Sequence, residues 1–505
     1  MKLKIKFTSA PWAVAVFLIV SMFASSVNAD IYYVPDDFTT IQGAIDASVS
    51  NSDTVMVRPG TYYENLDIRE KVVSLISTDG PKDTVIDGGG VGSVVNLYRA
   101  GGGSLLEGFT ITNGAASYGG GINIYWSSLI VRDCVITGNI ATQRGGGVAV
   151  QQYAGFTAYD SVFENNHAES GGGFYVRTGG LFIHRTQILN NTATLYGGAF
   201  FSFGFVSNPN LHDSVVAGNL AKDGGGFYSW GRSADARATN SIITDNVAEY
   251  GGPFYTRGGG FFARNSTIVN NTATVEGGGG YADADTNYVR SVNSVIYHNS
   301  SPPVLLLDPA NTVITYTDIE GGLLGEGNID ADPQFVDLAD GDYHLRSGSP
   351  CIDSGTSAEN GLPDHDIEGN PRPQGLNYDM GAYEMPPCRE VPQFDITSFD
   401  PEIIWPPNKE TVDITVTGSI ILPDACNLIS AGYTLIDEYG EHSSSDTLDV
   451  DEDGGFMLSL PVTAWRDGDD KIGRSYTLSL DAQDEAGAAG SDPLVATVPH
   501  DQSDE

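Results

Sequence analysis

A unit of 25 to 28 residues repeats through the middle of the chain and constrains the fold more than any other feature. Each unit holds a short apolar strand that usually begins with Ser, then Asn-x-Ala, then a glycine cluster, then a new apolar or aromatic strand. The period is too regular for chance, and its β-formers and glycines argue against a helical repeat. The anchor asparagines are Asn113, Asn139, Asn166, Asn191, Asn219, Asn246 and Asn271, with a last related one at Asn299.

Two further positions recur within each unit. The residue five before the anchor Asn is small, usually Ser, and the residue three before it is apolar. Because side chains alternate along a strand, both positions point inward. If each unit makes one turn of a coil, equivalent residues lie about 4.8 Å apart along its axis. The sequence therefore predicts an all-β fold, a parallel β-helix, with an interior Asn ladder at one bend and glycines with positive φ at the next.

Residues 1–29 predict an exported protein. Lys2, Lys4 and Lys6 precede an apolar run at residues 12–20, and small residues follow before the predicted cleavage point. The apolar run is too short to span a membrane, so it is typical of a secretory signal. We expect a secreted or cell-surface protein with no integral membrane segment after the signal is removed.

The chain is strongly acidic, with a formal net charge of −40. This charge argues against nucleic acid and anionic membranes as partners. It suits an extracellular protein that holds Ca²⁺ or works in salt.

Four cysteines in 505 residues are too few for a disulfide scaffold. Cys134 takes the small interior position of its unit, so we expect a buried core residue. Cys388 and Cys426 fall in the C-terminal part and could pair there, but the sequence does not decide whether they do.

Residues 53–65 read DTVMVRPGTYYEN and follow an amphipathic helix signal near residues 38–48. This run resembles the first coil of the pectin lyase-like right-handed β-helices, pectin methylesterases included. The resemblance implies a right-handed parallel β-helix over residues 30–327. The helix would cover the open apolar end of the first coil. The resemblance brings no catalytic residue with it.

The central repeats resemble a second set of proteins with the same fold. Residues 163–166 read FENN and residues 197–200 read GGAF. These look like the paired short motifs of polymorphic outer membrane proteins, which are bacterial surface adhesins. Most units here have Gly-Gly-Gly where that family has Gly-Gly-Ala.

Residues 328–385 change character, with NIDADPQF at 328–335, GSPCIDSG at 348–355, DIEGNPRP at 366–373 and DMGAYE at 379–384. This set resembles the domain called choice-of-anchor Q, which closes many secreted bacterial β-helices ahead of varied sorting signals. A purely structural interpretation serves equally well, because the open final coil must be covered.

The last part of the chain predicts a separate module. Prolines mark a linker at residues 386–400, and alternating strands with Gly and Asp turns follow over residues 401–505. Roughly a hundred residues of short strands fit an immunoglobulin-like β-sandwich.

We find none of the catalytic motifs of known β-helix polysaccharide enzymes. The coil region has no Gly-His-Gly or Asn-Thr-Asp, which polygalacturonases need to pair an acid with a water-activating carboxylate. It also lacks the Arg-x-Pro-x-x-Arg of pectate lyases. The only Gln-Asp, as in the Gln-Asp-Thr of pectin methylesterases, is Gln483-Asp484 in the predicted sandwich. The sequence therefore identifies no catalytic residue.

Two outward columns are candidates for sugar binding, because aromatic faces stack on sugar rings while polar neighbours meet the hydroxyls. The alternative is that the rings stack on one another and stiffen the sheet. The first column holds Tyr175, Phe201, Tyr228 and Tyr255; the second, two residues further on, holds Tyr125, Gln151, Arg177, Phe203, Trp230 and Arg257.

A third outward column lies seven residues before each Asn. Its two histidines between arginines could bind an acidic glycan or form a weak acid/base site. A solvated polar face is the alternative. The column holds Arg132, Tyr159, His184, His212, Thr239 and Arg264.

Asp449, Asp451 and Asp453, followed by Gly454, have the spacing of the first half of a Ca²⁺ loop. Leu460 stands where an EF-hand needs its last carboxylate. The sequence therefore leaves two interpretations open, a calcium site or an acidic turn between two strands.

Together these features predict a secreted or cell-surface protein that binds a polysaccharide or cell-surface glycan without catalysis, in an adhesive role. One alternative is a polysaccharide lyase or glycoside hydrolase whose acids lie on neighbouring coils, at spacings that no linear motif records. Another is a structural element of a surface layer. The sequence gives neither the ligand nor the oligomeric state.

Overall fold

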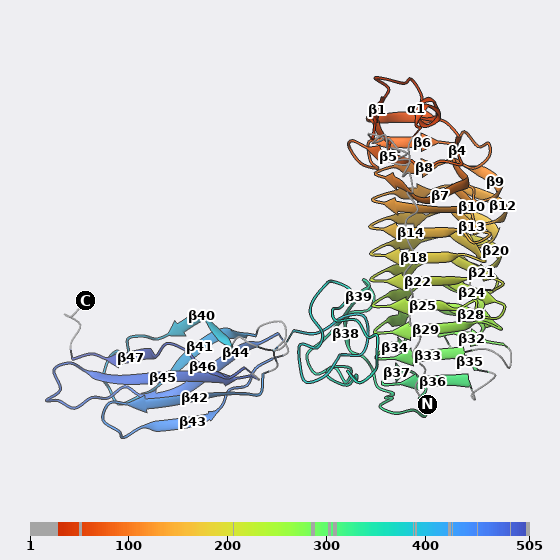
Figure 1. Ribbon diagram of the computed structural model, residues 1–505. Helices are drawn as coiled ribbons and strands as arrows, with labels where there is room; N and C mark the ends of the chain where they lie inside the picture. The colour runs from red at the N-terminus through yellow and green to blue at the C-terminus, as the bar shows by residue number, and fades with distance from the viewer. Residues whose placement is uncertain are drawn as a thin grey trace, which may run out of the picture.

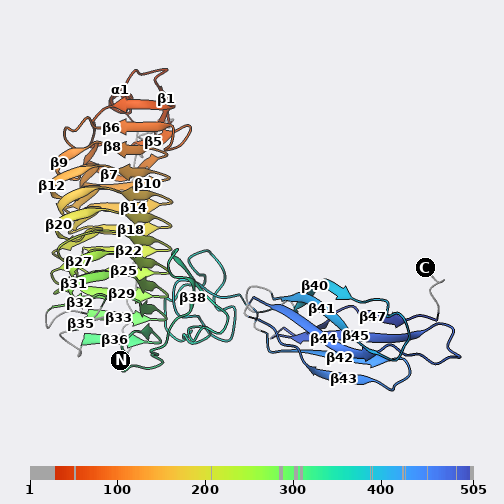
Figure 2. The same cartoon turned by 180° about the vertical axis from the view of Figure 1, so that it is seen from behind.

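The computed structural model describes residues 29–49, 53–205, 207–283, 288–300, 305–306, 311–386, 388, 391–422, 426, 428–451, 453–484 and 486–500. Apart from Ala29, the predicted signal at residues 1–29 lies outside them. Figure 1 and Figure 2 show a tall parallel β-solenoid, with a second all-β module out to the side of its lower end. The predicted all-β fold is confirmed.

The solenoid is built from three parallel sheets that run along its axis, here called A, B and C. Sheet A has twenty described strands in two limbs, A1 and A2, which meet at a bend in each coil. Limb A1 contains β4 (Leu66–Arg69), the first part of β7 (Val95–Glu107), the first part of β10 (Ile122–Arg132), β13 (Val148–Gln151), β17 (Phe174–Arg177), β21 (Phe200–Phe203), β24 (Phe227–Trp230), β28 (Phe254–Arg257), β32 (Tyr281–Ala282) and β35 (Leu305–Leu306). Limb A2 contains β1 (Ile31–Val34), β2 (Thr54–Val57), β5 (Ser74–Ser77), the second parts of β7 and β10, β14 (Gly155–Tyr159), β18 (Gly180–His184), β22 (Asn208–His212), β25 (Ala236–Thr239), β29 (Gly260–Arg264), β33 (Tyr288–Val292) and β36 (Thr312–Thr315).

Sheets B and C complete each coil. Sheet B follows limb A2 and contains β3 (Gly60–Tyr63), β6 (Thr84–Asp87), β8 (Thr110–Thr112), β11 (Val135–Thr137), β15 (Val162–Glu164), β19 (Gln187–Leu189), β23 (Val215–Ala217), β26 (Ile242–Thr244), β30 (Thr267–Val269), β34 (Val295–Tyr297) and β37 (Asp318–Ile319). Sheet C follows sheet B and contains β9 (Ala115–Tyr118), β12 (Ile140–Arg144), β16 (His167–Ser170) and β20 (Thr192–Tyr196), and further along the axis β27 (Val247–Tyr250) and β31 (Thr272–Glu276). Inward apolar side chains of all coils form one continuous core.

The predicted Asn ladder is confirmed. The Oδ1 atom of Asn191 accepts from the backbone N and Nδ2 of Asn166 at 3.1 and 3.0 Å, and its Nδ2 donates to Asn219 and to the Phe163 carbonyl. Each buried amide is therefore satisfied by the coils on either side. The same pattern joins Asn139, Asn166, Asn191, Asn219, Asn246, Asn271 and Asn299.

The anchor at Asn113 is wrong by one residue. The Asn139 Oδ1 accepts from the backbone N of Gly114, which occupies the ladder position of that coil. Asn113 instead adopts a φ of 57° and lies exposed just before it.

The glycine clusters make the bend from sheet C to limb A1, as predicted. The first glycine of each cluster has a positive φ, for example 68° at Gly171 and 69° at Gly145. The second has no room for a side chain, since a Cβ on Gly172 would lie 2.6 Å from the carbonyl oxygens of Thr192 and Gly198. Glycine is therefore needed at both positions.

Helix α1 (Ile41–Ala47) covers the first coil, close to the predicted residues 38–48. Ile41, Ala44 and Ile45 join the solenoid core. The Glu64 carboxylate accepts from the backbone N of Ile41 and of Gln42, both at 2.9 Å. A carboxylate there satisfies free N–H groups and suits the helix dipole.

Residues 328–385 close the solenoid mainly from the side, which corrects the prediction that they cover the final coil. Several of them contact that coil: Asn328 accepts from the Thr317 backbone N, Ile329 donates to the Thr317 carbonyl, and Cys351 Sγ donates to Asp318. The rest, with the hairpin β38 (Phe335–Asp337) and β39 (Asp342–Leu345), packs on the outer face of sheet B. Outward apolar residues of sheet B explain this docking, because water would otherwise meet Ile242, Val269 and Val295.

The C-terminal module has two antiparallel sheets around one core, compatible with a small β-sandwich. One sheet holds β40 (Gln393–Asp400), β41 (Thr411–Ile421) and β44 (Gly455–Thr463); the other holds β42 (Ser430–Asp437), β43 (Ser443–Thr447), β45 (Arg474–Gln483), β46 (Ala488–Gly490) and β47 (Leu494–Val498). The predicted linker at 386–400 is too long, because β40 pairs with β41 and belongs to the module. The module therefore includes residues before the predicted 401–505. Its immunoglobulin-like topology stays a prediction.

Candidate ligand-binding surface

The outer face of limb A1 carries the two aromatic columns in register. Tyr175, Phe201, Tyr228 and Tyr255 are direct partners on successive strands, and Tyr98, Tyr125, Gln151, Arg177, Phe203 and Trp230 form the second column. The predicted stacking of coils therefore aligns these side chains along the axis.

Three of the four residues in the first column are buried and Tyr255 is half-buried, contrary to the prediction that the column forms an outer binding surface. Tyr175 has no exposed surface and Tyr228 keeps 1%. The end of sheet C covers them: Arg144 Nη1 donates to the Tyr175 hydroxyl at 2.8 Å, and the Tyr196 ring lies 4.6 Å from the Tyr228 ring. Tyr175, Phe201 and Tyr228 form a second apolar cluster outside the solenoid core, so the interpretation that the rings stiffen the sheet holds for them.

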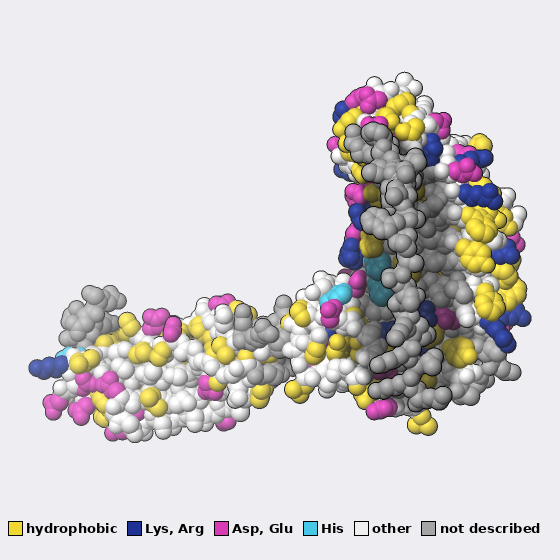
Figure 3. Space-filling view, in the orientation of Figure 1, with side chains coloured by type: hydrophobic (Ala, Val, Ile, Leu, Met, Phe, Trp, Pro, Cys, Tyr) yellow, Lys and Arg dark blue, Asp and Glu magenta, His cyan; other side chains and the backbone are white. Residues whose placement is uncertain are grey.

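The second column is accessible and is called here the aromatic ridge: Tyr98, Tyr125, Arg177, Phe203, Trp230 and Arg257. Trp230 keeps 38% of its surface exposed, and Arg177 and Arg257 are exposed too. Trp230 packs edge-on against Phe203 at 5.3 Å, and the Arg257 guanidinium lies 5.6 Å from the Trp230 ring. Hydrophobic side chains with Lys or Arg among them gather along one edge of the solenoid in Figure 3.

A polar cluster lies beside the ridge near Trp230. The Tyr255 hydroxyl donates to Asp283 Oδ2 at 2.5 Å, and Arg257 Nε lies 3.8 Å from the same oxygen. Burial raises the pKa of Asp223, and the neighbouring carboxylates Glu249 and Asp283 add to that rise. Two carboxylates, a guanidinium and a phenol therefore lie close together: Asp223, Asp283, Arg257 and Tyr255. No sequence motif indicated this cluster.

The third column lies on limb A2, where the rings stack face to face. The Tyr159 and His184 centroids are 5.0 Å apart, and those of His184 and His212 are 5.2 Å apart. Both imidazoles are half-buried, and burial is the main cause of their lowered pKa values. Both imidazoles are therefore neutral at pH 7. His365 of the closing segment lies beside this column, with its Nε2 3.4 Å from Asp213 Oδ1.

The structure does not bring the three carboxylates of the predicted calcium loop together. Asp451 Oδ1 accepts from the backbone N of Asp453 at 3.0 Å and of Gly455 at 2.7 Å, which closes a turn into β44. Among the described residues, the only group of three potential metal ligands within 4.8 Å of one another lies elsewhere. For Asp449, Asp451 and Asp453 the structure therefore favours the acidic turn.

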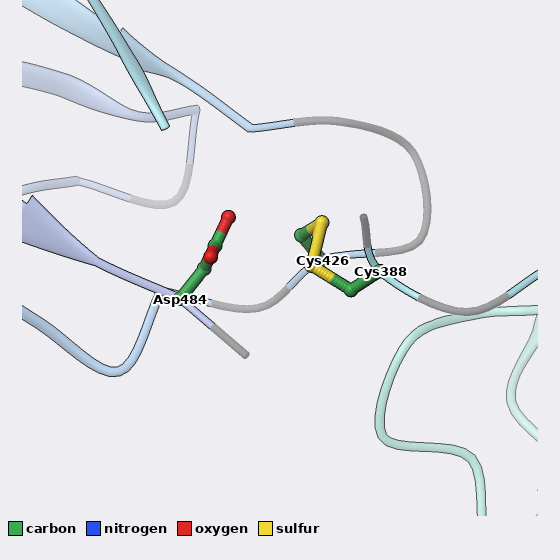
Figure 4. A group of neighbouring side chains, drawn as sticks. All are labelled: Cys388, Cys426 and Asp484. Atoms are coloured by element: carbon green, nitrogen blue, oxygen red, sulfur yellow. A yellow bond between two sulfur atoms is a disulfide. The ribbon is translucent and has the colours of Figure 1, made fainter. Parts of the chain in front are cut away.

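That other group is Cys388, Cys426 and Asp484, shown in Figure 4. The two cysteines form a disulfide, which answers the question that the sequence left open. Their sulfur atoms are therefore committed to each other. Cys134 is buried, as predicted.

Sequence reasoning missed a hollow of about 730 Å³ in the closing segment. His344 lies in its wall, with Nδ1 2.6 Å from Asp342 and Nε2 3.3 Å from Glu368, and its ring packs on Tyr383 at 3.9 Å. The two carboxylates raise the pKa of His344 against the effect of its partial burial. These residues lie outside the repeat, so no periodic signal marked them.

Comparison with known proteins agrees with this architecture. The family described as "Right handed beta helix region" matches residues 93–272. This stretch is a right-handed β-helix. No curated protein matches the chain.

Solved structures similar to this β-helix include several pectin methylesterases. The carrot enzyme is 15% identical, with 57% of this chain and 87% of that chain covered and a TM-score of 0.30. PemA from Erwinia chrysanthemi is 11% identical, with 59% and 80% covered and a TM-score of 0.21. A pectin methylesterase in complex with a hexasaccharide is 12% identical, with 60% and 82% covered and a TM-score of 0.23. At these identities and TM-scores the likeness carries no argument about function.

Among the described residues, no helix has the length and apolar character needed to cross a membrane.

Proposed function

We propose that this protein is a secreted or cell-surface β-helix that binds a polysaccharide along its aromatic ridge. The observation that carries the proposal is the alignment of exposed aromatic and Arg side chains on successive coils of limb A1. Strands in neighbouring coils lie about 4.8 Å apart, close to the length of one sugar unit, so successive rings of an extended glycan can meet successive side chains.

The proposed location at the cell surface is supported by sequence resemblance alone. The signal-like residues 1–29, the repeats similar to polymorphic outer membrane proteins and the choice-of-anchor-like residues 328–385 all favour the cell surface. An adhesive role follows from that location, because a solenoid that binds glycan along its length can hold a cell to a polysaccharide matrix.

We expect the double substitution Phe203→Ala and Trp230→Ala to weaken polysaccharide binding by about tenfold or more, since each stacked ring contributes about 0.5–1.5 kcal/mol. Binding is measured by affinity electrophoresis and calorimetry against a panel of glycan polymers. Tyr63→Ala is the matched control, because Tyr63 is an aromatic residue with 77% exposure on sheet B, away from the ridge. Equal binding by the double variant and the wild type would remove the ridge from the proposal.

A second candidate function, glycan cleavage, is favoured by the polar cluster of Asp223, Tyr255, Arg257 and Asp283. Burial raises the pKa of Asp223, which makes this carboxyl a candidate general acid, and a neighbouring carboxylate is the candidate base. If the cluster is catalytic, screening of uronic-acid polymers will reveal new unsaturated ends or reducing sugars. Asp283→Asn is then expected to lower turnover by about 100-fold or more, and Asp340→Asn, an exposed acid elsewhere, to leave it unchanged. Absence of turnover across the panel would rule this candidate out.

A further inference from the structure

Three arginines gather on limb A2 near the closing segment, here called the arginine patch: Arg237, Arg264 and Arg290. Arg237, Phe262 and Arg290 are partners on successive strands, and the Phe262 ring lies between the two guanidiniums at 4.9 and 5.9 Å. Arg264 lies two residues after Phe262 on β29, so it points to the same face. The patch is therefore a continuous cationic surface over three coils.

The positive charges of the patch are poorly compensated. Arg237 has a single ion pair, with Asp235 at 3.4 Å. In the part of the chain that the structure describes, Arg264 and Arg290 have no ion pair. The chain has only 25 basic residues against 65 acidic ones, so carboxylates are not scarce. Arg264 lies diagonally across from both Arg237 and Arg290 on the neighbouring strands, so an anionic partner would relieve the repulsion among the three charges.

A small hollow of about 70 Å³ opens between these arginines and the closing segment. Arg264 and Arg290 line it, together with Phe262, Val313, Thr315 and, from the closing segment, Glu359. The Thr315 Oγ1 is buried and has no hydrogen-bond partner among the described residues. Two guanidiniums and a free hydroxyl therefore border a space large enough for one small oxyanion, with Glu359 also in the lining.

We infer that this hollow binds the anionic group of an acidic glycan, either the carboxylate of a uronic acid or a sulfate ester. Guanidinium forks match the planar or tetrahedral oxygens of such groups with paired hydrogen bonds. The net negative charge of the protein does not prevent this, because remote charges are screened beyond about 8 Å at physiological salt. The inference deepens the proposed function and rests on it, since it names the class of polysaccharide.

The third column extends the patch along the axis. The residues that follow above Arg264 are Thr239, His212, His184 and Tyr159. Because the rings of Tyr159, His184 and His212 stack face to face, they present their polar edges, not their faces, to a bound glycan. In Figure 3 cyan and dark blue side chains lie together along the edge of the solenoid above the closing segment. The carboxylates beside this track include Asp213, Asp235 and Glu359, so a glycan with spaced rather than dense charges fits it.

The test measures binding of three polymers at low and high salt: one built of uronic acid, one sulfated but without uronic acid, and one uncharged. We expect the wild type to bind one charged polymer at least about tenfold more tightly than the neutral one. The variant Arg264→Gln with Arg290→Gln should lose that preference and keep the affinity for the neutral polymer. Whether the uronic or the sulfated polymer is preferred identifies the source of the anion.

Two controls separate the patch from the ridge and from general charge. Arg232→Gln removes an exposed positive charge on the neighbouring bend and should change nothing. Arg290→Lys keeps the positive charge but loses the paired N–H donors of the guanidinium, so the preference for the charged polymer should fall in part. This conservative variant still tests the inference if the double variant does not fold. An unchanged preference in the double variant, or no preference in the wild type, would overturn the inference. Loss of neutral-polymer binding on substitution of Trp230 alone would still support the proposed function.

Discussion

Replacing Asn191 by Ala should lower the free energy of unfolding by about 4 kcal/mol or more. The effect is large because the side chain is fully buried and water cannot replace its hydrogen bonds. Its side chain makes hydrogen bonds to Asn166, Asn219 and the Phe163 carbonyl, all of them buried. Substitution removes four hydrogen bonds at roughly 1 kcal/mol each and leaves the Asn166 backbone N–H without its ladder partner. Asn166 Nδ2 keeps its bond to the Ile136 carbonyl, and Asn219 Oδ1 keeps its bond from the Asn191 backbone N. The loss is local to one coil, yet it interrupts a ladder that runs through the solenoid.

Urea unfolding followed by circular dichroism measures this effect, with hydrogen exchange to locate it. Asn210→Ala is the matched control, because Asn210 is half-buried and its Nδ2 donates only to the Asn208 carbonyl on its own strand. The control should change stability by no more than about 0.5 kcal/mol. A ladder variant as stable as the control would mean that the amides contribute no net stability.

The ladder was predictable because the repeated side chain itself makes the contact. The period alone placed Asn139 and its successors over one another, and hydrogen bonds confirm that placement. Asn113 was assigned to the ladder wrongly because the residue just before the ladder position, which has a positive φ, is also Asn in some units. Asn165 and Asn190 are examples. Two adjacent positions favour Asn for different reasons, so the predicted ladder position of the first unit was shifted by one residue, from Gly114 to Asn113.

The candidate site was predictable only in part. Strand alternation placed Tyr175 and Tyr228 outside the solenoid, which is correct for their direction. It could not show that sheet C folds over them, because that depends on the angle of the glycine bend and on side chains such as Arg144 and Tyr196. The ridge residues Trp230 and Arg257 lie two positions further from that bend and stay exposed.

The closing segment and the arginine patch needed the structure. The segment does not repeat, so no period could show that it docks on sheet B. The hollow beside Arg264 depends on Glu359, which is far from Arg264 in sequence and near it in the fold. Contacts between a repeat and a non-repeating segment leave no pattern in a single sequence.

Raising the pH from 4 to 8 should weaken the docking of the closing segment by about 4 kcal/mol through Asp379 alone. Asp318 of β37, which accepts from Cys351 of the segment, adds to this loss. Burial raises the pKa of Asp379 from 3.8 to about 7 and that of Asp318 from 3.8 to about 6. The folded segment therefore binds more protons than the unfolded chain between about pH 4 and pH 7, so stability falls as pH rises through that range. The raised pKa of His344 acts in the same direction, because its contribution is also lost as pH rises.

Hydrogen exchange across β38, β39 and residues 378–384 measures this change, after correction for the intrinsic effect of pH on exchange. Asp379→Asn cannot ionise, so it should flatten the profile, whereas Asp340→Asn, an exposed acid in the same segment, should leave it unchanged. His184 and His212 titrate in the opposite sense, since their lowered pKa values remove stability as pH falls below about 6.5. They lie on limb A2, so protection there should fall at acid pH while the closing segment tightens. Protection of the closing segment that rose with pH would contradict a buried, protonated Asp379 as the cause.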